Sequence, residues 1–272
     1  MPAKSPRSTK ARAVLGVLAL LFLAAMPVSG DKGAGVTLPV GEQLSYSVSW
    51  AGIRCGAMRI TSFRETDPSG APIERIVVLL RSSKFFDGIY RVRSRLDSTY
   101  DPVLASSVRY RERSQEKKKR KDELWVVDHE SSEVVRHGKD GDERIPLAEA
   151  RVLDPLAFVF SLRSLGTEVE REEVFNLMTS DGVVKTTART TAAKTFKTKA
   201  GRCDAVAVVP EPRDEMLFSK SGAMVVWVER SEPHRPCRIE FDLSFGKLVA
   251  NLTSVSDGGG EDDIVSWESW GD

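Results

Sequence analysis

The sequence predicts a mainly β protein, built as one large, curved antiparallel sheet with one helix packed on it. Three observations support this fold class. Segments in which apolar and polar residues alternate recur along most of the chain. Polar turns rich in glycine and proline separate these segments. A helical pattern is found at 154–165. Two arrangements fit the pattern, a half-open barrel and a two-sheet sandwich.

The N-terminus has the pattern of a secretory signal peptide. A basic segment at 4–12 precedes an apolar run at 13–26, and 27–30 supplies a break and small residues, so we expect cleavage after Gly30. The apolar run is shorter than the ~20 residues that span a bilayer. We therefore expect an exported protein, periplasmic or on the cell surface. After the signal peptide (1–30), we expect a single β-rich domain at 31–256 and a flexible acidic tail at 257–272.

The strands of the first half follow from alternation and from the turns between them. The segment 44–50 alternates apolar residues with serines, and 53–64 returns after a turn at Ala51 and Gly52. Gly56 inside the returning strand indicates a bulge or a close backbone approach. Further strands are expected at 73–81, 91–100, 104–113, 124–127 and 134–135. Loops are expected at 85–90 and 137–144, and a charged hairpin tip at 115–122.

The helix at 154–165 has clear start and stop signals. Asp154 suits the N-cap, Pro155 the first helical position, and Gly166 the end. Its wide apolar face predicts packing on the sheet. Strands are then expected at 169–178, 183–198 and 204–209, followed by a meander at 223–228, 238–245 and 248–253. The run 223–228 is apolar throughout, which is typical of a strand buried on both faces.

The chain has three cysteines, Cys55, Cys203 and Cys237. Cys203 and Cys237 fall on strands that a flat meander places two spacings apart, roughly 9–10 Å. That exceeds the ~7 Å limit between bridged Cα atoms, so we predict buried free thiols, with a Cys203–Cys237 disulfide as the alternative. We predict no metal site and no cofactor, because the chain has no CxxC and its histidines lack paired ligand spacing.

A ladder of arginines is the most specific local feature. It consists of Arg91, Arg93, Arg95, Arg109, Arg111 and Arg113 on the two strands of a hairpin that turns at Asp101 and Pro102. If the apolar residues of both strands share one face, the arginines share the other, with Arg93 opposite or diagonal to Arg109. Neighbouring acids or an anionic ligand must then compensate the charge; phosphate, a lipid headgroup and an anionic glycan all qualify. The alternative is a solvated outer face screened by salt, Asp97 and Glu123.

The sequence carries none of the common enzyme signals. G-x-S-x-G, H-E-x-x-H, the P-loop and G-x-G-x-x-G are all absent, so we predict a non-enzymatic protein. The basic run 117–121 resembles a nucleic-acid patch, but behind a signal peptide it indicates a solvated hairpin tip or peripheral contact with an anionic membrane. We expect no nucleic-acid partner.

A curved sheet with a helix across it encloses space, and this predicts a ligand cavity. We expect an apolar or anionic amphiphilic ligand such as a lipid, with Phe158, Phe160, Tyr46 and Trp227 lining the cavity. Two alternatives are a structural or assembly role with an envelope protein partner, and a hydrolase whose catalytic residues follow no recognised motif.

Several dispersed motifs resemble those of a known family. They are 41–46 with 51–53 and Gly56, 154–158 with 162–163, 196–203, 226–228, 235–236 and 245–248. In these the chain resembles the bacterial exported family called domain of unknown function 3108, and the likeness covers most of 40–255. The resemblance implies a periplasmic or cell-surface β-rich domain and brings no established activity, so no catalytic residue is carried over. Glu229 and Arg230 depart from the acidic or small residue usual after the Trp227 strand.

Overall fold

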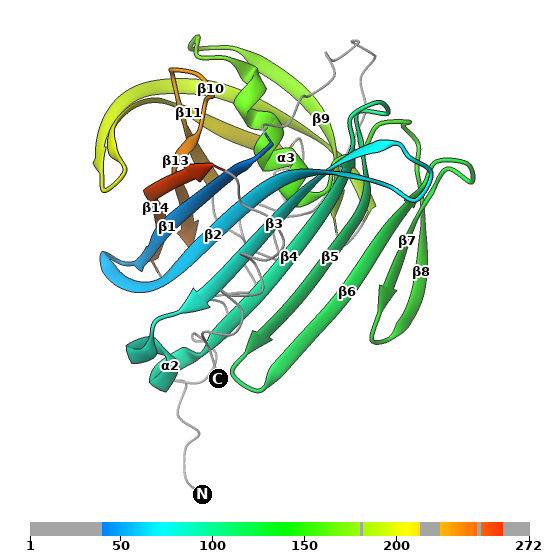
Figure 1. Cartoon of the computed structure of the whole chain (residues 1–272), viewed down its shortest axis with the longest axis horizontal. Helices are drawn as coiled ribbons and strands as arrows, with labels where there is room; N and C mark the ends of the chain where they lie inside the picture. Colours follow the sequence, from blue (N-terminus) through cyan, green and yellow to red (C-terminus); the bar gives the residue numbers. More distant parts are fainter. Residues whose placement is uncertain (1–39, 180–181, 213–223, 244–245, 258–272) are drawn as a thin grey trace, which may run out of the picture.

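The computed structural model describes residues 40–179, 182–212, 224–243 and 246–257. All strands of this described part form one antiparallel sheet of 14 strands, which curves around a helix without closing fully (Figure 1). The predicted fold class is confirmed as the half-open barrel, and the two-sheet sandwich is excluded. The predicted signal peptide and the acidic tail from 258 lie outside the described residues.

The order of elements along the chain is simple. The first strands are β1 (Glu42–Trp50), β2 (Ile53–Thr66), β3 (Pro72–Ser82), β4 (Val92–Asp101), β5 (Ser106–Glu116), β6 (Lys119–Asp128), β7 (Glu133–Gly138) and β8 (Gly141–Pro146). Helix α2 (Lys84–Tyr90) joins β3 to β4, and α3 (Pro155–Ser161) with the 3-10 turn η3 (Leu162–Leu165) follows β8. The last strands are β9 (Glu172–Thr179), β10 (Gly182–Thr198), β11 (Gly201–Pro212), β12 (Met224–Glu229), β13 (Pro236–Leu243) and β14 (Gly246–Asp257).

Sheet order follows chain order, with one exception that joins the two halves. β1 pairs with β14, so the first and last strands meet in the middle of the sheet and β8 and β9 form its two ends. Gly56 confirms its prediction: the ladder of β1 and β2 shifts register beside it, and a Cβ at Gly56 would lie 2.4 Å from the Arg81 carbonyl oxygen. This close approach requires glycine.

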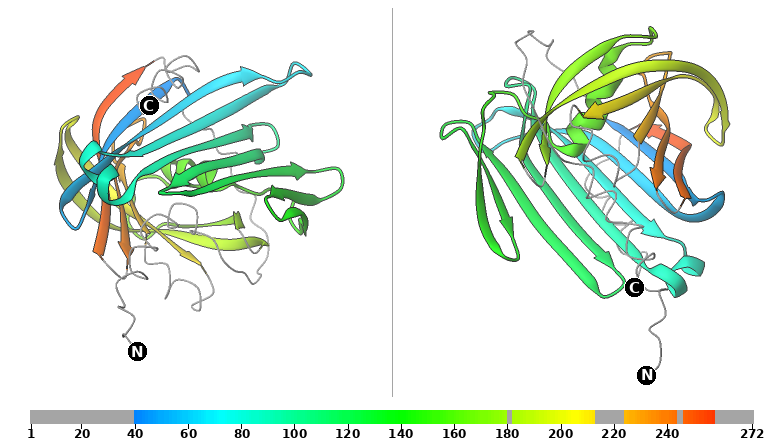
Figure 2. Two further views of the ribbon diagram at one scale, coloured as in Figure 1. Left: turned by 90° about the horizontal axis from the view of Figure 1, so that it is seen from below. Right: turned by 180° about the vertical axis from the view of Figure 1, so that it is seen from behind.

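A short segment before α3 links β9, at one end of the sheet, to β5. The Ser107 amide donates to the Val152 carbonyl at 2.8 Å, while the Leu153 amide donates to the Asn176 carbonyl at 2.8 Å. The segment therefore bridges β5 and β9, and the strands β6 to β8 extend past this junction. Figure 2 shows the hairpin of β7 and β8 (green) standing out from the rest of the barrel. This segment spans the gap in the barrel, because the two end strands β8 and β9 do not pair with each other.

The helix prediction is confirmed and the surroundings explain its pattern. Leu156, Ala157, Phe158 and Phe160 of α3 are all buried, because the helix lies inside the curve of the sheet rather than on a flat surface. Most of the buried apolar residues form one cluster on this inner face. We call the side of the sheet toward α3 the inner face and the opposite side the outer face.

Three local predictions are wrong. The segment 85–90 is not a loop: Ser83 caps α2 by accepting the Phe86 amide, which offsets the low helix propensity of Gly88. The segment 137–144 is not a loop either, because β7 and β8 pair across a tight turn between Gly138 and Gly141. β12 is buried on one face only, since Met224, Val226 and Val228 are buried and the residues between them are half-buried.

The cysteine prediction is also wrong. Cys203 and Cys237 form a disulfide with their Cα atoms 6.6 Å apart, and Cys55 is the free thiol among the described cysteines. The flat-sheet distance does not apply, because Cys237 lies at an irregularity in the ladder of β12 and β13, between the pairs Trp227–Arg238 and Val228–Pro236, and such a bulge bends the strand. Cys203 faces Phe196 of β10, and both cysteines are buried. The spacing of the cysteines in the sequence does not reveal this irregularity.

Candidate functional site

Helix α3 is held at its N-terminal end by a buried carboxylate. Asp154 accepts hydrogen bonds from the Leu156 amide at 2.8 Å and the Ala157 amide at 3.1 Å. Its other oxygen accepts from the hydroxyls of Ser98 on β4, at 2.5 Å, and Ser107 on β5, at 2.7 Å. Burial raises the pKa of Asp154, although these hydrogen bonds act in the opposite direction. The helix start is thereby fixed to two strands at once.

The other end is held by a buried ion cluster. Arg163 on η3 donates to Glu42 of β1 at 2.8 Å and to the Pro233 carbonyl at 2.7 Å. Arg235 donates to the second oxygen of Glu42 at 2.5 Å, so two guanidinium groups share one carboxylate. A buried charge is tolerated only when it is paired in this way. With both ends fixed, α3 crosses the interior of the barrel in one position.

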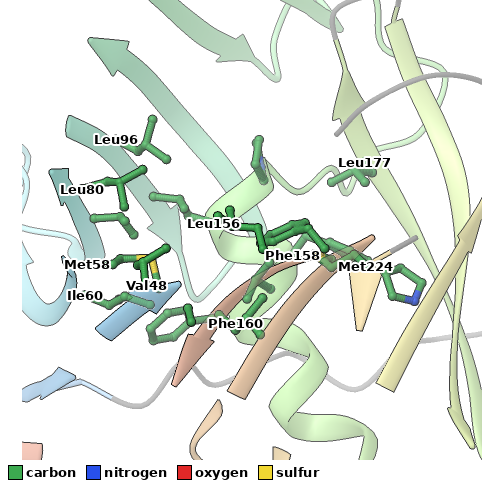
Figure 3. Close-up of a pocket in the computed structure, with 18 of the residues that line it drawn as sticks. Val48, Met58, Ile60, Leu80, Leu96, Leu156, Phe158, Phe160, Leu177 and Met224 are labelled. Atoms are coloured by element: carbon green, nitrogen blue, oxygen red, sulfur yellow. The ribbon is translucent and has the colours of Figure 1, made fainter. Parts of the chain in front are cut away.

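An apolar cavity of about 80 Å³ lies between α3 and the sheet (Figure 3). Its labelled lining residues come from β1 to β4, α3, β9 and β12: Val48, Met58, Ile60, Leu80, Leu96, Leu156, Phe158, Phe160, Leu177 and Met224. Among the described residues that line it, Thr186 carries the sole polar side chain. Such a lining suits hydrocarbon and offers no group for acid–base or nucleophilic chemistry.

The four residues predicted to line a cavity do not all lie together. Phe158 and Phe160 line it. Tyr46 is buried elsewhere on the inner face, where its hydroxyl donates to the Pro236 carbonyl at 2.6 Å. Trp227 alternates with the inward-pointing Val226 and Val228, and its ring packs edge-on against Phe196 at 4.8 Å. Neither Tyr46 nor Trp227 is among the residues that line the cavity.

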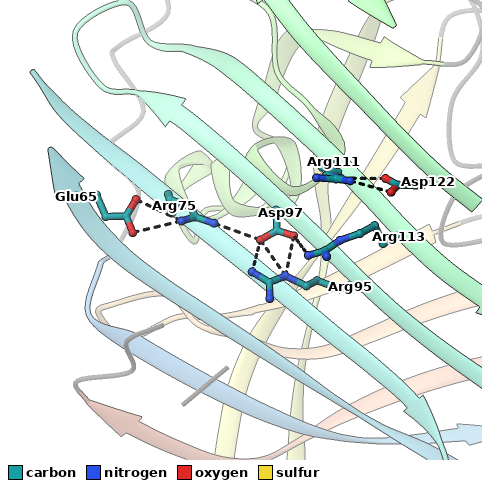
Figure 4. Close-up of polar contacts among 7 residues, drawn as sticks. All are labelled: Glu65, Arg75, Arg95, Asp97, Arg111, Arg113 and Asp122. Atoms are coloured by element: carbon teal, nitrogen blue, oxygen red, sulfur yellow. Dashed lines mark hydrogen bonds and ion pairs between the residues drawn. The ribbon is translucent and has the colours of Figure 1, made fainter. Parts of the chain in front are cut away.

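The arginine ladder lies on the outer face, and Asp97 is at its centre (Figure 4). The Nε of Arg95 donates to Asp97 at 2.8 Å, and Arg75 donates to the same carboxylate at 3.2 Å. The guanidinium of Arg113 lies 3.6 Å from the same carboxylate of Asp97. Acids from the same and neighbouring strands therefore compensate part of the positive charge. The sequence predicts this charge-compensating role for Asp97.

The pairing register differs from the expected one. The hairpin of β4 and β5 forms with the arginines on one face as predicted, but Arg93 faces Gln115 and Arg109 faces Thr99. Arg93 and Arg109 are therefore not neighbours, and that prediction is wrong. The like-charged pair that does face across this hairpin is Arg95 and Arg113. Glu123, expected to screen the ladder, instead pairs with Lys121 at 3.2 Å, opposite Glu112 of β5.

The other ladder arginines have their own acid partners or line the surface. Arg93 binds Asp87 of α2 with two hydrogen bonds, at 2.7 and 3.0 Å. Arg111 binds Asp122 of β6 in the same two-pronged way, and the hydrogen bond from Arg111 lowers the pKa of Asp122. Arg91 and Arg109 each line a hollow of the outer face.

Two adjoining hollows cover this part of the outer face, and Arg95 and Arg113 line both. We call their arginines the arginine surface: Arg75, Arg81, Arg91, Arg93, Arg95, Arg109, Arg111, Arg113 and Arg120. Three acids, Glu65, Asp97 and Asp122, also line the hollows. Burial, and to a smaller extent the nearby charges of Arg93 and Arg59, lower the pKa of Arg81.

The sequence analysis missed Arg75, Arg81 and Arg120 as members of this surface. The signal was present, because Arg75 and Arg81 fall on the same alternate positions of β3 as Val77 and Leu79, which form a small outer-face cluster with Phe63. Arg75 lies over the Phe63 ring at 5.4 Å. A strand with apolar residues on both faces conceals which face its arginines share.

Metal-binding groups and membrane-spanning helices were both considered for the described part of the chain. No group of three or more His, Cys, Asp or Glu side chains in the described ranges is arranged to hold a metal ion. Within those same ranges, no helix has the length and apolar character needed to cross a membrane.

One solved structure supports the barrel-like fold, and two further structures show a weaker similarity. A β-barrel-like protein of domain of unknown function DUF1849 from Brucella abortus is similar with a TM-score of 0.54 and 10% identity, over 81% of this chain and 99% of that one. A candidate exported protein with a YmcC-like fold from Bacteroides fragilis gives a TM-score of 0.31 at 10% identity, covering 81% and 97% of the two chains. A candidate lipoprotein from Parabacteroides distasonis gives 0.28 at 10% identity, covering 80% and 96%.

The sequence comparisons identify the family. No protein with a curated description matches the chain. A family model described as protein of unknown function DUF3108 matches residues 45–253, a region that includes β2 to β13 and the whole of α3. The match confirms the resemblance seen in the dispersed motifs, and the chain therefore belongs to the DUF3108 family.

Proposed function

We propose that this protein is a non-enzymatic protein of the bacterial cell envelope that holds an apolar ligand, the end of a lipid acyl chain, between α3 and the sheet. One observation carries the proposal: the lining of the cavity is hydrocarbon apart from Thr186. A cavity of this kind gains affinity by removing apolar surface from water. The buried networks at Asp154 and Arg163 support it as well, because they keep the cavity preformed.

The size of the cavity restricts the ligand. Pockets that enclose a whole drug-sized molecule measure roughly 300–1,000 Å³, whereas this cavity measures about 80 Å³. An apolar cavity of ~150 Å³ is known to accept benzene. We therefore propose that only the terminal part of a chain enters, while the rest of the lipid remains outside the cavity.

The polar end of that lipid is not bound by the arginine ladder under this proposal. The ladder lies on the outer face and the cavity on the inner face of the same strands. A single amphiphile with its tail beside Leu96 cannot reach Arg95 through the sheet. The apolar cavity and the arginine surface are thus two separate candidate sites.

Export is part of the proposal, and the disulfide supports it. Disulfides persist in oxidising compartments such as the bacterial periplasm and are rare in the cytosol. The bond between Cys203 and Cys237 therefore favours the periplasm or the cell surface. The pattern of residues 1–30 independently predicts the same destination.

Lipid extraction tests the proposed ligand. The whole chain is expressed, the soluble form is purified without detergent, and bound lipid is identified by mass spectrometry of an organic extract. We expect co-purifying acyl lipid in the wild type and its loss in Ala250→Leu, because the added side chain fills the cavity that Ala250 lines.

A volume-conserving change is the control. Met58→Leu alters another lining residue without reducing the space, so this variant should retain its lipid. The proposal fails if the wild-type protein carries no lipid and takes up none from added fatty acid. It also fails if Ala250→Leu, folded with wild-type stability, retains as much lipid as Met58→Leu.

A further inference from the structure

Two large apolar side chains on α2 are exposed to solvent. Phe85 is 75% exposed and Ile89 is 61% exposed. They are four residues apart, so they lie on the same side of the helix. Lys84 and Gly88 are exposed beside them. Singly exposed apolar residues are common, but a pair projecting together from a short helix beside a strong charge indicates a contact surface.

The helix that carries them is fixed to the sheet. The Tyr90 hydroxyl donates to Glu116 at the end of β5 at 2.8 Å, and the Lys117 ammonium lies 4.9 Å from the Tyr90 ring centre. The Lys117 amide donates to the Arg91 carbonyl at 2.8 Å. Phe85 and Ile89 are therefore presented by a supported structure, not by a loose loop.

The same end of the sheet is strongly basic. The turn between β5 and β6 exposes Lys117, Lys118, Lys119 and Arg120. Figure 1 shows this turn and α2 at one end of the molecule, and the contacts of Tyr90 and Arg91 with the turn agree. One hollow of the arginine surface extends from this end, with Arg81, Arg91 and Arg93 among its lining residues. We call α2 and residues 117–120 together the α2 end.

We propose that the α2 end docks on the surface of an anionic phospholipid bilayer. Lysine and arginine side chains contact the lipid phosphates, while Phe85 and Ile89 enter the boundary between headgroups and acyl chains. The observation that selects a bilayer over a soluble polyanion is the pair of exposed apolar side chains. A nucleic acid or a charged glycan satisfies the cations but offers no hydrocarbon phase to the two side chains.

This inference is independent of the proposed cavity ligand. The cavity is lined from the inner face, whereas the α2 end lies at the tips of β3 to β6. A membrane-docking face and an acyl-binding cavity in one protein are compatible, but either proposal can fail alone. Lipid extraction reports on the first and vesicle binding on the second.

Vesicle co-sedimentation tests the docking. The soluble protein from expression of the whole chain is mixed with vesicles of phosphatidylcholine alone, or of phosphatidylcholine containing phosphatidylglycerol. We expect binding to the anionic vesicles that weakens as salt is raised. Lys118→Glu with Lys119→Glu and Arg120→Glu should lower the partition coefficient at least about tenfold. Phe85→Ser with Ile89→Ser should lower it about fivefold and leave part of the salt dependence.

Matched variants elsewhere control for general surface effects. Val103 and Leu104, 78% and 44% exposed, lie in the turn between β4 and β5 at the other end of these strands, so Val103→Ser with Leu104→Ser should bind like the wild type. Lys197→Glu with Lys199→Glu changes exposed lysines at the β10–β11 hairpin and should have little effect. All changed residues are exposed, so thermal unfolding should confirm intact folds.

Three results would overturn the proposal. The first is an absence of binding to anionic vesicles at low salt. The second is binding that the α2-end variants leave unchanged, or that the control variants reduce equally. Binding to a soluble polyanion such as heparin that survives Phe85→Ser with Ile89→Ser, without vesicle binding, would also overturn it in favour of a polyanion site.

Discussion

The inner and outer faces of β3 and β4 are made by alternating residues of the same two strands, and they differ in chemistry. Val78 and Leu80 of β3 and Leu96 of β4 are buried against the barrel interior. Arg75, Arg95 and Asp97, in alternate positions of the same strands, form the ion group of the outer face. The period of two in a strand separates these two sets of side chains, although Val77 and Leu79 of β3 add a small apolar cluster to the outer face.

The two faces should contribute differently to folding stability and to contacts with other molecules. Inner-face groups are removed from water, so each change leaves a void or an unpaired polar group. Outer-face ion pairs keep solvent contact, and such pairs contribute little to folding. The inner face should therefore dominate stability, and the outer face should dominate contacts with other molecules. The following changes test that division, beginning with the largest expected effect.

Phe158→Ala should cost the most. Phe158 is fully buried and its ring packs edge-on against Phe175 at 5.4 Å. Removing a buried phenyl ring costs about 3–5 kcal/mol of unfolding free energy. Denaturant unfolding measures the loss, and Phe85→Ala on the exposed side of α2 should stay within about 0.5 kcal/mol of the wild type. Equal losses in the two variants would contradict the division.

Loss of the disulfide should have the next largest effect. Cys203 and Cys237 are 34 residues apart, and both are buried. Cross-linking a loop of this length stabilises a protein by roughly 2–5 kcal/mol. We expect Cys203→Ser with Cys237→Ser to lower the unfolding midpoint, and reducing agent to lower it in the wild type but not in the variant. A wild-type midpoint that does not change after reductant has converted Cys203 and Cys237 to free thiols would show that the bond does not stabilise the fold.

Asp97→Asn should have a modest effect on stability, and this effect should depend on the salt concentration. The substitution leaves Arg75, Arg95 and Arg113 without their shared carboxylate. We expect a loss of about 1 kcal/mol, larger at low salt because screening is weaker there. Thermal unfolding at two salt concentrations measures it, with Asp122→Asn as a more exposed control. A loss as large as that of Phe158→Ala would show that the outer face also carries the fold.

The two faces should respond to pH in opposite directions. Burial raises the pKa of Asp154 on the inner side, so its contribution to stability is full below the unfolded value of about 3.9 and is lost as pH rises through the folded value. The hydrogen bond from Arg111 lowers the pKa of Asp122, whose contribution is present above that unfolded value and is lost as pH falls.

Thermal unfolding across the acid range separates these contributions. Asp154→Asn should remove the decline of stability with rising pH that the buried carboxylate causes, and Asp122→Asn should slightly reduce the loss of stability at acid pH. An unchanged pH profile in Asp154→Asn would mean that its carboxylate titrates equally in the folded and unfolded chains.

The sequence by itself determined most of the strands, the main helix and, for many strands, which residues share a face. Alternation in 44–50 and 91–100 is a local property, because neighbouring side chains of any strand point to opposite sides. Asp154, Pro155 and Gly166 similarly specify the helix through capping and backbone preference, without reference to the rest of the fold. The family was recognisable for the same reason, since its motifs are local.

Tertiary structure decided everything that depends on distance between strands. The register set Arg95, not Arg93, against an arginine of β5, and a bulge beside Thr99 determined that register. The irregular ladder of β12 and β13 set the position of Cys237, which bonds to Cys203 of β11, and the curvature of the sheet placed α3 inside the barrel, with Phe158 and Phe160 at a cavity that Tyr46 and Trp227 do not line. Alternation fixes only which face a side chain occupies. Register and curvature arise from the packing of all strands together, so no single segment of the sequence encodes them.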